Sequence, residues 1–170
     1  TLAVYVNTQN HEGWWYEGGG IYRHVWLIKT NLVSVDLWGV YANPVLKDNS
    51  SWEVRTETTV RNDFFHSKKR ISIEGIILDK NGYTISTSKS SGLIDIKDKR
   101  TFKYDFLVDN PKLWSPETPN QYIMRTNIYV GKNLVDSYDV KFGFRTVEII
   151  PEKGLFINNK YYKIKGICGH

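Results

Sequence analysis

Hydrophobic and polar side chains alternate with a period of two along most of the chain between residues 31 and 144. In the run Phe102–Val108, the even positions are all apolar or aromatic, and they alternate with Lys103, Asp105 and Leu107 on the odd positions. This alternation is typical of β-strands that bury one face and expose the other. Four further runs show the same period: Val54–Val60, Ile71–Leu78, Tyr122–Val130 and Leu134–Phe142. We find no convincing helical pattern, so the sequence predicts an all-β fold.

Turn-forming residues separate these runs. Asp79–Gly82 ends in Asn-Gly, which is a strong hairpin signal between two strands. Gly131–Asn133 predicts a second hairpin, and the two prolines of Ser115–Pro119 place that segment in a connecting loop. Short strands at this spacing, in a chain with a single cysteine, predict an immunoglobulin-like antiparallel β-sandwich of about 100 residues with flanking pieces of neighbouring domains.

Composition adds limits on the partners. The chain has 170 residues, of which 41% are hydrophobic and 24% are charged, so it can form a packed core. The net charge of +5 is spread out, and the denser groups Lys68–Arg70 and Lys97–Arg100 adjoin predicted turns. Solvated loops explain them better than a nucleic-acid surface. No apolar run approaches the roughly 20 residues of a membrane span. We therefore expect neither a nucleic-acid nor a membrane partner, and no cofactor.

The chain divides into three regions of different character. Residues 1–30 are rich in Trp and Gly, residues 31–144 carry the strand-and-turn pattern, and residues 145–170 contain a predicted tight hairpin at Phe156–Tyr161. The final segment, Tyr162–His170, reads as the start of another strand. A single strand with two unpaired edges is not a stable ending by itself, so we expect the chain to be a fragment of a longer protein.

The first region contains an aromatic and glycine-rich motif, Gly13–Leu27. Its glycines permit a positive φ or a close backbone approach, which favours a tightly packed corner at a domain junction. Direct contact of its aromatic rings with a sugar is the alternative, because flat rings stack on sugars. The motif residues that we single out are Trp15, Tyr16, Gly18, Gly20 and Arg23, with Arg23 as an ion-pair anchor.

This motif resembles the end of the N-terminal sugar-binding jelly roll of glycoside hydrolase family 2, which includes β-galactosidases, β-glucuronidases and β-mannosidases. Leu113–Pro119, with Trp114 and Pro116, resembles a segment of the family's immunoglobulin-like middle domain, and Phe142–Arg145 is similar to the join between that domain and the barrel. Residues 155–160 and 165–170 look like the approach to the catalytic (β/α)₈ barrel and its first strand. The resemblance implies three parts: residues 1–30 (jelly roll), 31–144 (sandwich) and 145–170 (linker and first barrel strand).

The resemblance also implies where the chemistry lies. Retaining glycosidases use two carboxyl groups roughly 5–5.5 Å apart, and the family carries both as Glu on later barrel strands. The chain contains no Asn-Glu pair of the acid/base type, so both catalytic glutamates are expected beyond His170 and the fragment is expected to be inactive. In the full enzyme, His170 is implied to line the substrate pocket. Glu148 and Glu152 are interpreted as surface charges. Cys168 and His170 are too few ligands for zinc, so no metal site is expected.

Two hypotheses of function remain. The first is a non-catalytic segment of an exo-acting retaining β-glycosidase, whose partners are the other domains of the parent and a β-linked glycoside. The second is a stand-alone carbohydrate-binding or adhesion β-sandwich. The barrel-like segment near His170 favours the first, because a free-standing module has no use for it. The location stays open, with an exported enzyme favoured over a cytoplasmic one, and the sequence does not name the sugar.

Overall fold

The computed structural model describes residues 2–7, 20, 21, 23–48 and 50–168. These residues form strands and connecting loops, without a helix. In chain order the strands are β1 (Val33–Leu46), β2 (Ser51–Asn62), β3 (Lys69–Leu78), β4 (Thr84–Ile94), β5 (Asp98–Asp109), β6 (Tyr122–Val130), β7 (Asn133–Phe142), β8 (Val147–Ile150), β9 (Gly154–Ile157) and β10 (Lys160–Tyr162). The all-β prediction is confirmed. In the described part, no helix is long and apolar enough to cross a membrane.

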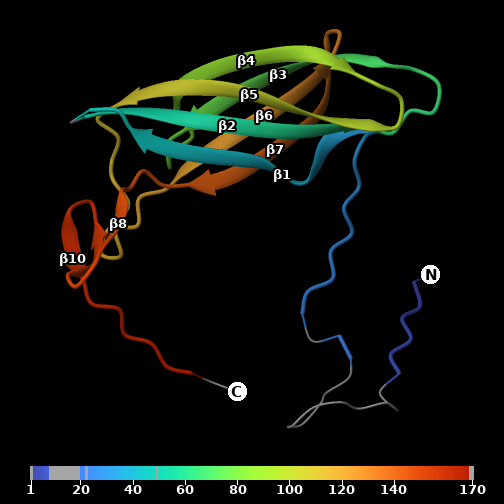
Figure 1. The fold of residues 1–170 in the computed structure, drawn as a ribbon. Coiled ribbons are helices and arrows are strands. Elements are labelled where there is room, and N and C mark those ends of the chain that lie inside the picture. The colour runs from blue at the N-terminus through green and yellow to red at the C-terminus, as the bar shows by residue number, and fades with distance from the viewer. Residues whose placement is uncertain (1, 8–19, 22, 49, 169–170) are drawn as a thin grey trace.

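Two antiparallel sheets lie face to face and form a sandwich (Figure 1). One sheet has the order β1-β2-β5 and the other has the order β4-β3-β6-β7. A third sheet, in the order β10-β9-β8, lies beyond one end of the sandwich. The segment before β1 leaves from the opposite end, so the two flanking segments depart from different ends of the sandwich (Figure 1). The predicted immunoglobulin-like sandwich is confirmed.

Much of the core consists of the residues at alternate positions that the sequence pattern assigned to one face, and β1 adds Val33, Val35 and Val40. Phe102, Phe106 and Val108 of β5 are buried, whereas Lys103 and Asp105 between them are exposed. Strands β2, β3 and β6 show the same alternation, and their buried apolar members are Trp52, Val54, Val60, Ile71, Ile73, Ile77, Met124 and Ile128. The facing rows of the two sheets fill the space between them, which is why a period of two located most of the core.

The predicted hairpins are present. Gly82 has φ of 86° in the turn from β3 to β4, and Gly131 has φ of 60° in the turn from β6 to β7. The turn from β9 to β10 is made by Asn158 and Asn159, with φ of 50° and 63°. Asn tolerates this left-handed region better than most residues other than glycine, so the two asparagines suit a two-residue turn.

One member of a predicted row lies on the wrong face. The period of two in Leu134–Phe142 predicts Leu134 on the same face as Tyr138, but Leu134 is exposed, and Val135 packs against the core in its place. The register between β6 and β7 shifts here, because Ile128 lies opposite Asp136 while Tyr129 lies opposite Leu134. This β-bulge inserts one residue and reverses the facing of what precedes it.

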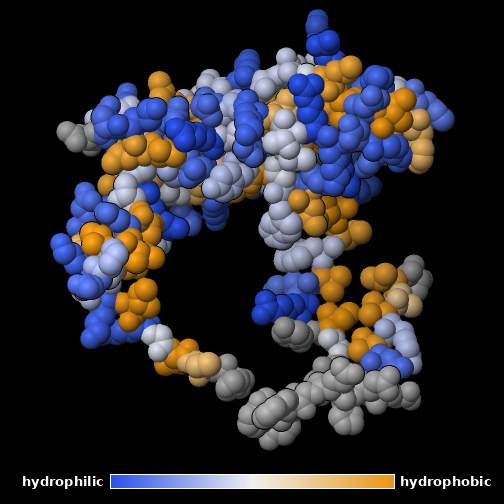
Figure 2. Space-filling model, in the orientation of Figure 1, coloured by the Kyte–Doolittle hydropathy of each residue, from blue (hydrophilic) through white to orange (hydrophobic). Residues whose placement is uncertain are grey.

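Apolar side chains also lie outside the sandwich. The described segment before β1 is extended and exposes large side chains, among them Trp26 at 78% and Leu27 at 95%. Figure 2 shows apolar groups along this segment and along the chain after β10, whereas polar groups dominate the visible face of the sandwich. Exposed apolar side chains at this density indicate surfaces that another part of a protein covers.

Candidate functional site

The third sheet is joined to the sandwich at the loop that follows β5. The loop residue Trp114 donates its backbone N–H to the carbonyl of Phe144 at 2.8 Å, so it is anchored to the chain that leaves β7. Gly143 lies against Trp114 so closely that a Cβ atom on it would be 2.9 Å from Trp114 Cβ. The two motifs singled out in the sequence, Leu113–Pro119 and Phe142–Arg145, therefore meet in space.

Phe144 fastens this junction to the core. Its ring is fully buried and packs edge-on against Tyr122 at 5.0 Å and Trp52 at 5.6 Å between ring centroids. The next residue, Arg145, points the other way and holds its guanidinium carbon 4.4 Å from the centre of the Trp114 ring. Adjacent residues on an extended chain face opposite sides, so one inserts into the core and the other covers the indole.

The loop keeps its shape through its own hydrogen bonds. Ser115 donates its N–H to the carbonyl of Thr118 at 3.0 Å, and its Oγ accepts the N–H of Thr118 at 3.1 Å. The Asn120 amide donates to the carbonyl of Leu113 at 2.9 Å. Trp114 is half-buried and Pro116 is exposed. The segment is thus a closed loop that presents Trp114 on one side and its proline-containing tip to the solvent.

Asn158 connects the third sheet to this loop. Its Nδ2 donates to the carbonyl of Trp114 at 2.9 Å, and its Oδ1 accepts the N–H of Thr146 at 3.0 Å. Its own N–H donates to the carbonyl of Thr146 at 3.1 Å. The hairpin turn is therefore held both to the loop and to the linker before β8.

A second connection is electrostatic. Glu117, in the loop, accepts hydrogen bonds from the Tyr162 hydroxyl at 2.7 Å and from Lys160 Nζ at 3.0 Å. These two donors, Tyr162 foremost, lower the pKa of Glu117 to about 2. The same contacts raise the pKa of Lys160 and of Tyr162. Glu117 is thus ionised at neutral pH and ties β10 to the loop.

We call this set of contacts, made by Trp114, Glu117, Asn158, Lys160 and Tyr162, the hairpin clamp.

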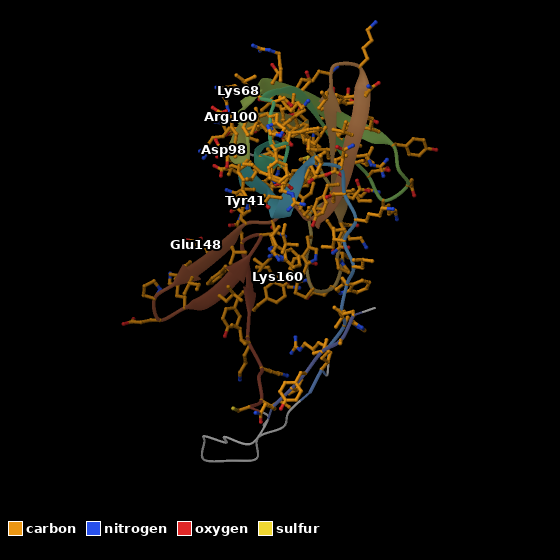
Figure 3. All side chains as sticks on the ribbon, turned by 90° about the vertical axis from the view of Figure 1, so that its right-hand side faces the viewer. Tyr41, Lys68, Asp98, Arg100, Glu148 and Lys160 are labelled. Atoms are coloured by element: carbon orange, nitrogen blue, oxygen red, sulfur yellow. The ribbon has the colours of Figure 1, made fainter. Side chains whose placement is uncertain are left out.

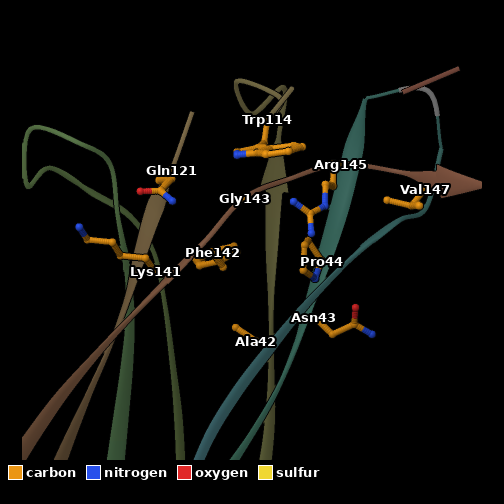
Figure 4. A pocket seen from close by; sticks show the side chains of 10 residues that line it. All are labelled: Ala42, Asn43, Pro44, Trp114, Gln121, Lys141, Phe142, Gly143, Arg145 and Val147. Atoms are coloured by element: carbon orange, nitrogen blue, oxygen red, sulfur yellow. The ribbon is translucent and has the colours of Figure 1, made fainter. Parts of the chain in front are cut away.

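Beside the hairpin clamp lies a pocket of about 520 Å³. It is bounded by the second half of β1, the end of β7 and the loop with Trp114. Figure 4 shows the guanidinium of Arg145 between the Trp114 ring and Pro44. The residues that line the pocket are Ala42, Asn43, Pro44, Trp114, Gln121, Lys141, Phe142, Gly143, Arg145 and Val147.

Within the described residues, every carboxyl group with a shifted pKa has a lowered one. The pKa of Asp36 is lowered chiefly by its 2.6 Å contact with Lys99, and Glu53 and Asp95 are lowered chiefly by Arg55 and Lys68. A catalytic acid needs a raised pKa. These carboxylates therefore behave as surface ion pairs.

Several predicted residues lie outside this junction. Gly20 is exposed with φ of 125°, and a Cβ on it would meet no atom within 4 Å. Arg23 is also exposed. Trp15, Tyr16, Gly18 and His170 lie outside the described residues. Their predicted roles stay predictions.

The charged groups assigned to the surface are exposed. Glu148 in β8 and Glu152 in the turn from β8 to β9 are both exposed, and Cys168 is an exposed free thiol. Lys68 and Arg100 lie with Asp98 at the end of the sandwich away from the sheet that carries Glu148 (Figure 3). Among the described residues, no group of three or more His, Cys, Asp or Glu side chains could hold a metal ion.

Sequence reasoning missed the members of the hairpin clamp other than Trp114. The hairpin Phe156–Tyr161 was predicted, but only as a turn. Asn158 and Glu117 bond to segments 44 and 45 residues away in the chain, and no local pattern reports such contacts. The only signal in the sequence was that both the loop after β5 and the last hairpin carry polar side chains that could pair.

Comparisons with known proteins agree with this architecture. The sequence model of "Glycosyl hydrolases family 2" matches residues 34–145. The chain is 31% identical over 170 residues to "Beta-galactosidase BoGH2A" of Bacteroides ovatus, and the match covers 99% of this chain and 20% of that protein. A "Putative beta-glucuronidase" of Formosa agariphila is 28% identical over 174 residues, covering 100% of this chain and 16% of the relative.

Solved structures share the fold. A glycosyl hydrolase family 2 member from Bacteroides cellulosilyticus superposes with a TM-score of 0.74 at 24% identity, over 80% of this chain and 17% of that one. The β-glucuronidase of Bacteroides uniformis also gives a TM-score of 0.74 at 24% identity, over 83% of this chain and 18% of that one. The chain thus spans about a fifth of the length of the proteins that it resembles.

Proposed function

Because this chain belongs to glycosyl hydrolase family 2, we propose that it is the non-catalytic β-sandwich segment of an exo-acting, retaining, β-galactosidase-like enzyme. In this proposal the parent hydrolyses O-glycosyl bonds of a β-linked glycoside. Residues 1–30 end a jelly-roll domain, residues 31–144 form the middle domain, and residues 145–170 lead into the barrel. The acid/base and nucleophile glutamates then lie on barrel strands beyond His170.

The hairpin clamp is the observation that carries this proposal. It fixes the chain that follows the sandwich at two places, through Asn158 at the turn and through Glu117 at β10. A binding module gains nothing from ordering the segment after its last strand. A segment that sets the direction in which the next domain begins does gain from it, because catalytic geometry tolerates only small displacements.

The exposed apolar residues before β1 give independent support. Trp26 and Leu27 are almost fully solvated in the described part of the chain. Leaving two large side chains in water forgoes roughly 1.5–3 kcal/mol each, relative to burying them. A preceding domain that covers this segment would recover that energy, and it is what the proposal places there.

The test compares the chain with its parent enzyme. The purified chain is expected to show no hydrolysis of nitrophenyl β-galactoside or β-glucuronide above background, while the parent hydrolyses one of them. Replacing each of two barrel glutamates in the parent by Gln should abolish turnover. Hydrolysis by the isolated chain would contradict the proposal.

A glycan titration distinguishes an enzyme segment from the alternative, a stand-alone carbohydrate-binding module. If the chain is an enzyme segment, neutral sugars bind too weakly to saturate at millimolar concentration. Saturable binding at lower concentration, together with a parent reading frame that lacks a barrel, would favour a carbohydrate-binding module instead.

A further inference from the structure

The charged residues that line the pocket beside the hairpin clamp are all positive. Of the residues that line it, Arg145 and Lys141 are cationic, Asn43 and Gln121 carry amides, and none is Asp or Glu. The remaining wall is apolar, with Trp114 and Phe142 as its largest members. A concave site with apolar walls and a few convergent polar groups is the usual form of a ligand site.

Neither cation is neutralised within the described part of the chain. The ion pairs there include Arg125 with Asp139 on the same sheet at 2.8 Å, but none that involves Arg145 or Lys141. Arg145 rests over the Trp114 ring, which leaves N–H groups at the edge of its guanidinium for another acceptor. Asn43 and Gln121 also line the pocket, and Figure 4 shows both apart from the guanidinium of Arg145.

Arg145 rests on a support that is anchored to the core, although its side chain is exposed. Phe144 is buried in the core and Trp114 is hydrogen-bonded to it through the backbone, so the support for the guanidinium is rigid. Ordering a long cationic side chain in advance removes part of the entropy that binding otherwise costs. The pocket is therefore prepared for an anion.

We propose that this pocket is a binding site for a carboxylate group attached to a carbon skeleton. Arg donates two parallel N–H groups to a carboxylate, and the apolar wall suits the carbon atoms next to it. Two sources share this chemistry: an acidic side chain of an adjoining protein segment, and a uronate sugar. The proposal rests on the pocket of this chain alone and holds whether or not the parent is a glycosidase.

The test uses the whole chain labelled with ¹⁵N and sodium acetate as the probe, at constant ionic strength against sodium chloride. The Gly143 amide and the Trp114 indole N–H should shift with acetate and saturate, with a half-point in the range of tens of millimolar. Arg145→Gln should weaken binding at least fivefold. Lys153→Gln removes the same charge from an exposed turn outside the pocket and should bind as the wild-type chain does.

Lys141→Gln guards against a folding defect, since Lys141 is exposed and makes no ion pair in the described part of the chain. It should weaken acetate binding while the other amide resonances stay in place. Shifts that remain linear to 200 mM acetate, equal shifts with chloride, or full binding by Arg145→Gln would each overturn the proposal.

Two further ligands distinguish the sources. Propionate represents a Glu side chain, and glucuronate is compared with glucose at the same concentration. Binding of glucuronate at least tenfold tighter than propionate, with no response to glucose, assigns the site to a uronate. Glucuronate binding no tighter than propionate assigns it to an acidic side chain of a protein.

Discussion

Asn158 and Trp114 are joined by a 2.9 Å hydrogen bond between the Asn158 amide and the Trp114 carbonyl. The bond links two elements that are 44 residues apart, the turn of the last hairpin and the loop after β5. Since Asn158 also accepts the N–H of Thr146 through its Oδ1, this one side chain makes two of the hydrogen bonds that hold the hairpin against the sandwich.

Asn158→Ala should therefore destabilise the last hairpin more than Asn159→Ala does. Asn158 and Asn159 both have positive φ, so Ala at either position carries a left-handed strain of about 1–2 kcal/mol. Asn158→Ala also loses two side-chain hydrogen bonds, worth about 0.5–1.5 kcal/mol each. Amide hydrogen exchange in β9 and β10 measures the local effect, with Asn159→Ala as the control. Equal acceleration in both variants would show that the hydrogen bonds contribute nothing.

The hairpin clamp should weaken in acid. The pKa of Glu117 is lowered to about 2 in the folded chain, against an ordinary value of 4.5. A lowered folded pKa contributes stability that is present above the unfolded value and is lost as the pH falls through the folded one. The contribution of Glu117 should thus decline from about pH 4.5 to about pH 2.

The measurement is urea unfolding of the wild-type chain and Glu117→Gln over this pH range. The difference in free energy of unfolding between the two chains should shrink as the pH falls. It should be small throughout, because Glu117 and Lys160 are exposed and screened by water. A difference that does not change with pH would mean that the carboxylate charge has no part in the clamp.

Gly143→Ala should disturb the packing of Trp114 against the chain after β7. The added Cβ would lie 2.9 Å from Trp114 Cβ and 3.2 Å from the Asn120 carbonyl oxygen, so the loop must shift. Overpacking of this kind costs about 1–3 kcal/mol. Gly166→Ala adds the same methyl where no atom lies within 4 Å and should leave the free energy of unfolding unchanged. The comparison is made by urea denaturation, and an unaffected Gly143→Ala variant would refute the close contact.

Replacing two buried threonines of β2 by Val should change the stability of the chain in opposite directions. Thr56 Oγ1 is buried without a hydrogen-bond partner among the described residues, so Thr56→Val removes a desolvated hydroxyl and should stabilise the chain by about 1–2 kcal/mol. The Thr58 hydroxyl bonds to the Tyr104 hydroxyl at 2.8 Å, and Thr58→Val should destabilise by about 1–2 kcal/mol. Thermal unfolding of both variants decides, and a destabilised Thr56→Val chain would indicate a hydrogen bond to an internal water.

Much of the sandwich could be predicted from the chain because its information is local. Phe102, Phe106 and Val108 bury one face of β5 through alternation alone, and Gly82 and Gly131 mark turns that need a positive φ. The same reasoning failed at Leu134. The bulge there depends on how β6 and β7 pair, and pairing is not visible in one strand's pattern.

The candidate site was only half predictable. Trp114 and Arg145 stood out as members of two motifs, yet nothing in the sequence said that one would cover the other at 4.4 Å. No pattern in the sequence marked Glu117 or Lys160 as partners, and their 3.0 Å contact exists only because the hairpin folds back onto the loop.

For most of the sandwich, the sequence by itself determined which residues form strands, which positions turn and which face of a strand is apolar. These properties follow from steric preferences and from the period of the side chains, which act within a few residues. The tertiary structure alone decided that Trp114, Arg145 and Asn158 meet, that the pocket beside them carries two cations without a carboxylate, and that the last hairpin is clamped to the sandwich. Those outcomes depend on contacts between distant segments, which exist only after the two sheets have packed and brought the ends of β5 and β7 together.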